Sequence, residues 1–83
     1  ERVMKRFAES AGKLVAEIAA GTGDAKRIAD LAHKLKGAAR AAGAMRLGDL
    51  AAVLEQSSDP ASIAALSAEW QRVVEALGAA SAA

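Results

Sequence analysis

Apolar residues recur three and four positions apart in four separate segments of this chain of 83 residues. Spacing of this kind lines up apolar side chains along one face of an α-helix, so each segment is expected to form an amphipathic helix. Four such one-sided helices can cover their apolar faces by packing around a common core. The four stripes consist of Met4, Phe7, Ala11, Leu14 and Ile18; of Ile28, Leu31, Leu35, Ala38 and Ala42; of Leu47, Leu50 and Leu54; and of Ile63, Leu66, Trp70, Val73 and Leu77.

The breaks between the segments carry residues that favour turns and helix caps. Thr22 or Asp24 can cap the second helix, and Asp59 can cap the fourth, where a proline follows it. Gly43 and Gly78 can each close a helix in the left-handed conformation. Because helices joined by short connections pack antiparallel to their neighbours, the four segments are expected to run alternately up and down.

We therefore predict an all-α fold, an antiparallel up-down-up-down four-helix bundle that occupies residues 1–83 as a single domain. Its helices are expected over roughly residues 1–20, 24–42, 44–57 and 60–77, followed by a frayed tail over residues 79–83. Abundant alanine and an aromatic content of 2% favour helices over strands. Phe7 and Trp70 are the only large aromatic residues, and we expect both in the core.

Charge and composition limit the partners and the compartment of the chain. Its 11 Lys and Arg residues nearly balance its 10 Asp and Glu residues, so no overall field attracts it to nucleic acid or to an acidic membrane. It has no cysteine for a disulfide or a thiolate zinc site, which favours a reducing compartment. Charges interrupt every apolar stretch before the ~20 residues of a membrane span. We expect a soluble, cytoplasmic domain, and the start at Glu1 without methionine is what we expect of an excised domain or of a processed product.

The only histidine, His33, lies in the second segment. A lone histidine in an alanine-rich helix is often partly buried and bonded to a backbone carbonyl. At about 100° per residue, however, His33 falls nearly opposite the apolar stripe of its own helix, which predicts a side chain that points to solvent. On the same face lie Lys26 and Ala29 before it, and Lys36, Gly37 and Arg40 after it.

These neighbours suggest a reactive role for His33. A neutral imidazole offers the lone pair of one ring nitrogen as a nucleophile, and Lys36 can offset the negative charge of an arriving phosphoryl group. Gly37 costs helix stability, so its missing side chain is expected to give another molecule access to His33. The sequence offers no base, no metal ligands and no pocket, so the site is expected to carry a group without activating one.

The motif HKLKGAA at residues 33–39 is followed by Gly43-Ala44, Leu47, Leu50 and the Leu54-Glu55 pair. Together with the predicted bundle, these residues resemble the histidine-containing phosphotransfer (HPt) domain of multistep two-component phosphorelays. The similarity is greatest to the C-terminal HPt domain of unorthodox (hybrid) sensor histidine kinases. The chain departs from the family pattern at Ala38, where the family often has serine, and at Ala42, where it has a larger hydrophobic residue.

The resemblance implies a phosphoryl carrier that is not an enzyme by itself. His33 would accept a phosphoryl group from a receiver-domain aspartyl phosphate and pass it to the Asp of another receiver. Lys36 would stabilise charge, and Gly37 would give steric clearance. No cofactor is expected in the domain, because in this family Mg²⁺ belongs to the receiver.

The resemblance also implies the partners. Response-regulator receiver domains would dock around His33 on Lys26, Ala29, Asp30, Lys34 and Arg40. We expect the isolated domain to be a monomer that contacts neither nucleic acid nor a membrane. The parent protein is expected to be a sensor kinase of the inner membrane.

Two other classes of function remain open. A helical docking module without covalent chemistry would use Lys26, Lys36 and Arg40 only as a solvated face. A helix-turn-helix DNA reader is suggested by the glycine between the second and third segments, but after Arg46 its recognition helix offers Asp49 and Glu55 in place of groups that bind bases and phosphates. An independent enzyme is disfavoured, because there is no Ser-His-Asp set, no HExxH motif and no phosphate-binding glycine loop.

Overall fold

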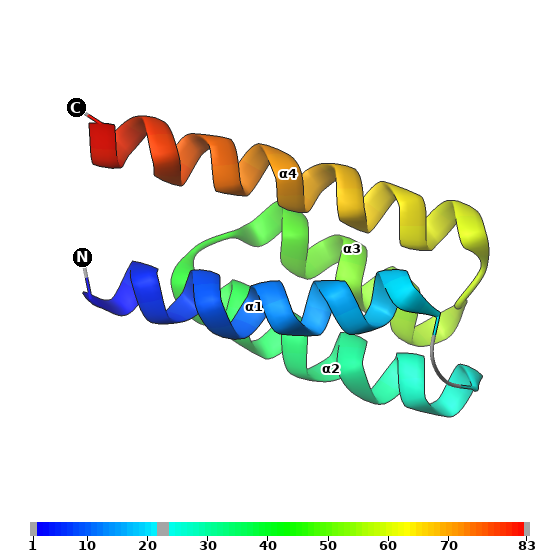
Figure 1. Cartoon of the computed structure of the whole chain (residues 1–83). Coiled ribbons are helices and arrows are strands. Elements are labelled where there is room, and N and C mark those ends of the chain that lie inside the picture. The colour runs from blue at the N-terminus through cyan, green and yellow to red at the C-terminus, as the bar shows by residue number, and fades with distance from the viewer. Residues whose placement is uncertain (1, 22–23, 83) are drawn as a thin grey trace.

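The computed structural model describes residues 2–21 and 24–82, with side chains described for 5–21 and 24–78. This part of the chain forms four helices and no strand: α1 (Arg2–Ala20), α2 (Ala25–Ala42), α3 (Met45–Gln56) and α4 (Pro60–Ala82) (Figure 1). The predicted all-α class and the number of helices are therefore confirmed.

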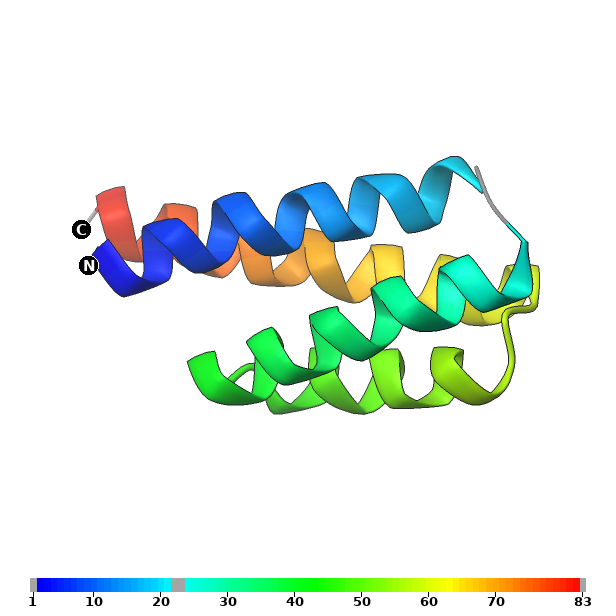
Figure 2. The ribbon, with the colours of Figure 1, turned by 90° about the horizontal axis from the view of Figure 1, so that it is seen from below.

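The helices form an antiparallel bundle about 40 Å long, in which each helix packs against the next one along the chain. α1 also packs against α4, which closes the ring. α1 begins and α4 ends at the same end of the bundle, where both helices extend beyond the turn between α2 and α3 (Figures 1 and 2). This arrangement is the predicted up-down-up-down bundle, with α1 and α2 on one side and α3 and α4 on the other.

Three of the predicted caps form. Asp24 accepts a hydrogen bond from the backbone N–H of Arg27 at 3.0 Å, whereas Thr22 lies outside the described residues. Gly43 ends α2 in the left-handed conformation at φ 86°. Asp59 accepts a bond from the backbone N–H of Ser62 at 2.7 Å, which holds the pKa of the Asp59 carboxyl below its ordinary value.

The predicted end of the last helix was wrong. α4 continues to Ala82, so residues 79–82 are helical and not a frayed tail, while Ala83 lies outside the described residues. Gly78 does not adopt a positive φ and therefore does not close the helix. Alanine has the highest helix propensity, and the alanine-rich sequence after Gly78 allows α4 to continue.

The core is built of alanine and branched aliphatic residues with one aromatic pair. Phe7 from α1 and Trp70 from α4 are both buried, as predicted, and their rings meet edge to face with centroids 6.0 Å apart. α2 contributes five buried residues, namely Ile28, Leu31, Ala32, Leu35 and Ala39. These residues fix the rotation of α2 and therefore decide which of its side chains face outward.

Candidate functional site

His33 lies on the outer face of α2, where 69% of its side chain is exposed. The five buried residues of α2 lie on the opposite side of the helix. The predicted orientation of His33 is therefore confirmed, and the structure excludes a histidine buried against a backbone carbonyl.

A carboxylate from the neighbouring helix holds the ring. Glu55 of α3 places Oε2 3.1 Å from Nδ1 of His33, and its Oε1 lies 2.5 Å from Nζ of Lys36. Glu55 is 19% exposed and Lys36 is 24% exposed, so both are much less accessible than the ring that they flank. His33, Glu55 and Lys36 thus form a cluster in which the imidazole is the exposed member.

The protonation of the cluster follows from these contacts. The ammonium of Lys36 holds the pKa of the Glu55 carboxyl below its ordinary value; burial opposes this effect and His33 adds to it. Glu55 is therefore ionised at neutral pH and can only accept hydrogen bonds. The hydrogen of a neutral His33 ring consequently lies on Nδ1, and the lone pair of Nε2 is left free.

The cluster also ties the stability of the fold to pH. Because the pKa of Glu55 is lowered in the folded state, its stabilising contribution is complete above the pKa of the unfolded chain. That contribution is lost as the pH falls through the lowered pKa of the folded state.

The cluster corrects two expectations from the sequence. We expected no base beside His33, but the carboxylate of Glu55 contacts its ring. We also expected Lys36 on the exposed face of the second helix, but only 24% of its side chain is exposed and its ammonium is paired with Glu55. Single-helix reasoning missed Glu55 because its position depends on how α3 packs against α2.

The sequence positions of His33 and Glu55 nevertheless indicate that the two residues lie opposite each other. Residues equally far from the turn of an antiparallel helical hairpin lie opposite each other. His33 and Glu55 stand eleven residues before and after Ala44. The ion pair between Arg40 and Asp49, at 3.6 Å, obeys the same symmetry to within one residue.

Gly48 allows α2 and α3 to come close beside this pair. It is buried, and a Cβ atom added there would lie 2.9 Å from Cγ of Arg40 and 3.7 Å from Cβ of Ala39. Any side chain at position 48 would therefore displace the stem of Arg40. Gly48 therefore leaves room for the Arg40 side chain between the two helices that carry His33 and Glu55.

Gly37, one turn after His33, is exposed, and a Cβ atom added there would meet nothing within 4 Å. Close packing against a neighbouring helix is therefore not the reason for this glycine. The open space beside His33 agrees with a role in access, which stays a prediction.

Replacing Gly37 with Ala is expected to stabilise the domain by about 0.5–1 kcal/mol, because glycine in a helix interior costs that much relative to alanine. The same methyl group should slow phosphoryl transfer by about tenfold, since a displacement of ~1 Å can cost up to about 10²-fold. Urea unfolding and the rate of transfer from a phosphorylated receiver measure the two effects.

Gly12→Ala provides the matched control for Gly37→Ala. Gly12 lies within α1, and a Cβ atom added there would make an ordinary contact, 3.5 Å from the ring of Trp70 of α4. It should stabilise the domain similarly and leave transfer unchanged. If Gly37→Ala transfers as fast as Gly12→Ala, access to His33 does not depend on Gly37.

The residues predicted to contact a partner share one face of α2 with His33. Lys26, Asp30, Lys34 and Arg40 are exposed, and Ala29 is partly exposed. Arg40 differs from the others, because its guanidinium is paired with Asp49 of α3. The structure thus brings these side chains to one surface, while their contact with a partner stays a prediction.

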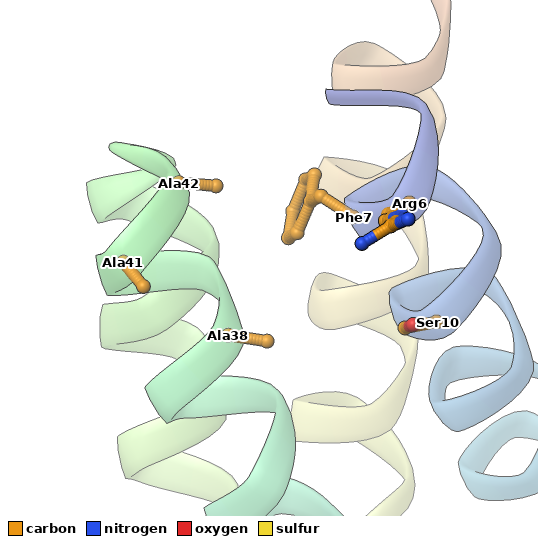
Figure 3. A pocket seen from close by; sticks show the side chains of 6 residues that line it. All are labelled: Arg6, Phe7, Ser10, Ala38, Ala41 and Ala42. Atoms are coloured by element: carbon orange, nitrogen blue, oxygen red, sulfur yellow. The ribbon is translucent and has the colours of Figure 1, made fainter. Parts of the chain in front are cut away.

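An apolar hollow of about 240 Å³ opens between α1 and the C-terminal half of α2 (Figure 3). The small side chains of α2 leave this space open, and at one of them, Ala42, the family pattern has a larger hydrophobic residue. Phe7 points into the space between the helices (Figure 3). The hollow is lined by Arg6, Phe7, Ser10, Ala38, Ala41 and Ala42.

The described residues contain no group of His, Asp and Glu side chains that could hold a metal ion. None of the described helices combines the length and the apolar character that a membrane crossing requires.

Comparison with known protein families agrees with the fold. A family model described as Hpt domain matches residues 2–80. The chain belongs to the HPt domain family. HPt domains are phosphocarrier modules of two-component phosphorelays that interact with receiver domains and are not themselves catalysts. Searches of curated proteins and of solved structures gave no significant match to this chain.

Proposed function

We propose that Nε2 of His33 accepts a phosphoryl group from the aspartyl phosphate of one receiver domain and passes it to the Asp of another. The observation that carries the proposal is the exposed ring of His33 with Nδ1 held by Glu55, which leaves Nε2 free. The Nε2 lone pair attacks phosphorus, the bond from phosphorus to the aspartyl oxygen breaks, and the aspartate leaves as a carboxylate. Transfer to the second receiver runs the same step in reverse.

Two side chains assist this step. When Nε2 gains the phosphoryl group, the ring becomes an imidazolium, and the carboxylate of Glu55 balances that charge through the hydrogen on Nδ1. The ammonium of Lys36 lies in the same cluster and can offset the charge of the phosphoryl oxygens. Glu55 is therefore a positioning residue, whereas His33 is the acceptor.

The receiver is proposed to dock on the outer face of α2 and on the apolar hollow next to it. Lys26, Ala29, Asp30, Lys34 and Arg40 supply the polar contacts around His33. The hollow offers the receiver an apolar surface within a few turns of His33 along α2. Mg²⁺ required for transfer would be held by the receiver.

The setting of the domain is proposed from the same features. The LKGAAR sequence that follows His33 supports a place at the end of a hybrid sensor kinase. Its receivers would then lie in the cytoplasm, and the domain would act there as a monomer. Direct contact with a membrane is not needed for any step.

Intact-mass measurement tests the proposal. The domain is mixed with a phosphorylated receiver and Mg²⁺, and the product is divided between acid and alkaline treatment. We expect one phosphoryl adduct that is lost in acid and kept in alkali, as a phosphohistidine requires. If no adduct forms with any receiver of a panel, while circular dichroism shows a folded domain, the chain is a docking module without covalent chemistry.

Glu55 variants test the positioning role. Glu55→Ala is expected to slow transfer by about 10–100-fold, the usual loss when the partner that orients a functional histidine is removed. Glu55→Gln should be slowed less, because its amide oxygen still accepts a bond from Nδ1. The ¹⁵N chemical shifts of the His33 ring should show a loss of the Nδ1–H tautomer in the Ala variant alone. Equal rates in Ala, Gln and wild-type proteins would contradict this role.

A further inference from the structure

The charges of the chain are divided unequally between the two sides of the bundle. α1 and α2 together carry nine of the 11 Lys and Arg residues but only three Asp and Glu residues. α3 and α4 carry two basic and four acidic residues. Because α1 packs beside α2 and α3 beside α4, a formal net charge of +1 conceals one basic side and one acidic side.

Ion pairs within the domain do not cancel the charge of the basic side. Both basic residues of the acidic side, Arg46 and Arg72, contact the carboxylate of Glu69. On the basic side, Lys13, Lys26 and Lys34 are exposed and make no ion pair within the described part of the chain. The uncompensated positive charge therefore lies on α1 and α2.

Lys26 and Lys34 belong to the proposed receiver surface, and Lys13 lies on the neighbouring helix α1. Lys34 is the neighbour of His33 in sequence, and Lys26 precedes His33 by two helical turns on the same face. Lys13 follows Ser10, which lines the hollow, by nearly one turn of α1. The basic surface thus includes both His33 and the rim of the hollow, and it extends to the first helix.

We propose that this basic surface, formed by Lys13, Lys26 and Lys34, selects receiver domains whose docking face is acidic and accelerates their encounter with His33. The inference rests on the proposed function, because it assumes that receivers dock at His33. Oppositely charged surfaces raise association rates by about 10–10³-fold and penalise partners of like charge. A protein partner is favoured over nucleic acid because Glu9, Glu17 and Asp30 lie on the same two helices and would repel phosphates.

The salt dependence of transfer is the first test. The Debye length falls from about 30 Å at 0.01 M salt to about 3 Å at 1 M, so steering is removed at high salt. We expect the second-order rate of transfer from an acidic receiver to fall at least about tenfold over this range, the lower end of the steering effect. A rate independent of salt would overturn the inference.

Charge reversal separates steering from other effects of salt. Lys26→Glu and Lys34→Glu should each lower the low-salt rate by about threefold to tenfold and match the wild type near 1 M salt. Arg72→Glu is the control: it makes the same change of charge on the acidic side, and Glu69 keeps its shorter contact with Arg46. If Arg72→Glu slows transfer equally, the rate depends on the net charge of the domain, and the proposed role of the basic surface is overturned.

Selection of the partner has its own test. A receiver in which acidic docking-face residues are replaced by lysine should react slowly with the wild type and faster with Lys34→Glu, as a double-mutant cycle would detect. If the effects of the receiver substitutions and of Lys34→Glu on the transfer rate are additive, the two surfaces do not contact each other through complementary charges. Failure of the proposed function would look different, because then no acid-labile adduct forms at any salt concentration. The surface would instead be a nucleic-acid site if the domain binds duplex DNA, if Lys26→Glu abolishes that binding, and if the rate of phosphoryl transfer does not depend on these charges.

Discussion

Replacing His33 with Gln is expected to abolish phosphoryl acceptance while leaving the stability of the domain within about 0.5 kcal/mol of the wild type, as for other exposed sites. An amide nitrogen has no nucleophilic lone pair, so no phosphoramidate can form at position 33. Stability should hold because 69% of the His33 side chain is exposed and glutamine suits a helix. Intact mass after incubation with a phosphorylated receiver, and a thermal melt, measure the two outcomes.

Gln71→Ala is the matched control, because it changes an exposed residue on α4, far from the proposed acceptor in sequence. This variant should accept the phosphoryl group as the wild type does. Glutamine at position 33 can still donate a hydrogen bond to Glu55, which keeps that carboxylate partnered. An adduct on His33→Gln would assign the acceptor to another side chain. A loss of stability above about 1 kcal/mol would mean that the His33 side chain packs more than its exposure indicates.

The direction of His33 could be predicted because it depends only on the periodicity of its own helix. The five buried residues of α2 fix the rotation of the helix, and any residue opposite them faces solvent. The caps were predictable for a similar reason, since Asp24, Gly43 and Asp59 act on the backbone within a few residues of themselves.

Glu55 could not be placed by that reasoning, because its contact with His33 requires the register between two helices. Gly48 contributes to this register, since its missing side chain leaves room for the stem of Arg40. The basic side of the bundle has the same origin. The net charge is a property of the sequence, but the separation of its signs appears only when α1 is placed beside α2.

Alanine accounts for most of the remaining differences. It is small and apolar enough for the core, the surface or a helix end, so its pattern says little about burial. Ala39 and Ala51 are fully buried, although neither belongs to a predicted stripe. The continuation of α4 past Gly78 into an alanine-rich segment was missed for the same reason.

Replacing Trp70 with Ala is expected to lower the free energy of unfolding by about 3–5 kcal/mol, the usual cost of truncating a buried tryptophan. Trp70 is 8% exposed, meets Phe7 edge to face and lies 3.5 Å from where a Cβ would stand at Gly12. The edge-to-face contact adds about 0.5–1.5 kcal/mol to the burial of the ring. Because Trp70 is the only tryptophan, urea unfolding is followed by circular dichroism.

A loss of this size approaches the whole stability of a small domain, about 5–15 kcal/mol, so Trp70→Ala can unfold outright. Trp70→Phe, which keeps an aromatic ring against Phe7, then supplies the measurable value and should lose clearly less. Val74→Ala on the same helix, at an exposed residue, should change stability by less than about 0.5 kcal/mol. If Trp70→Ala costs no more than Val74→Ala, the aromatic pair does not hold α1 to α4, and the alanine-rich contacts between the helices carry the fold.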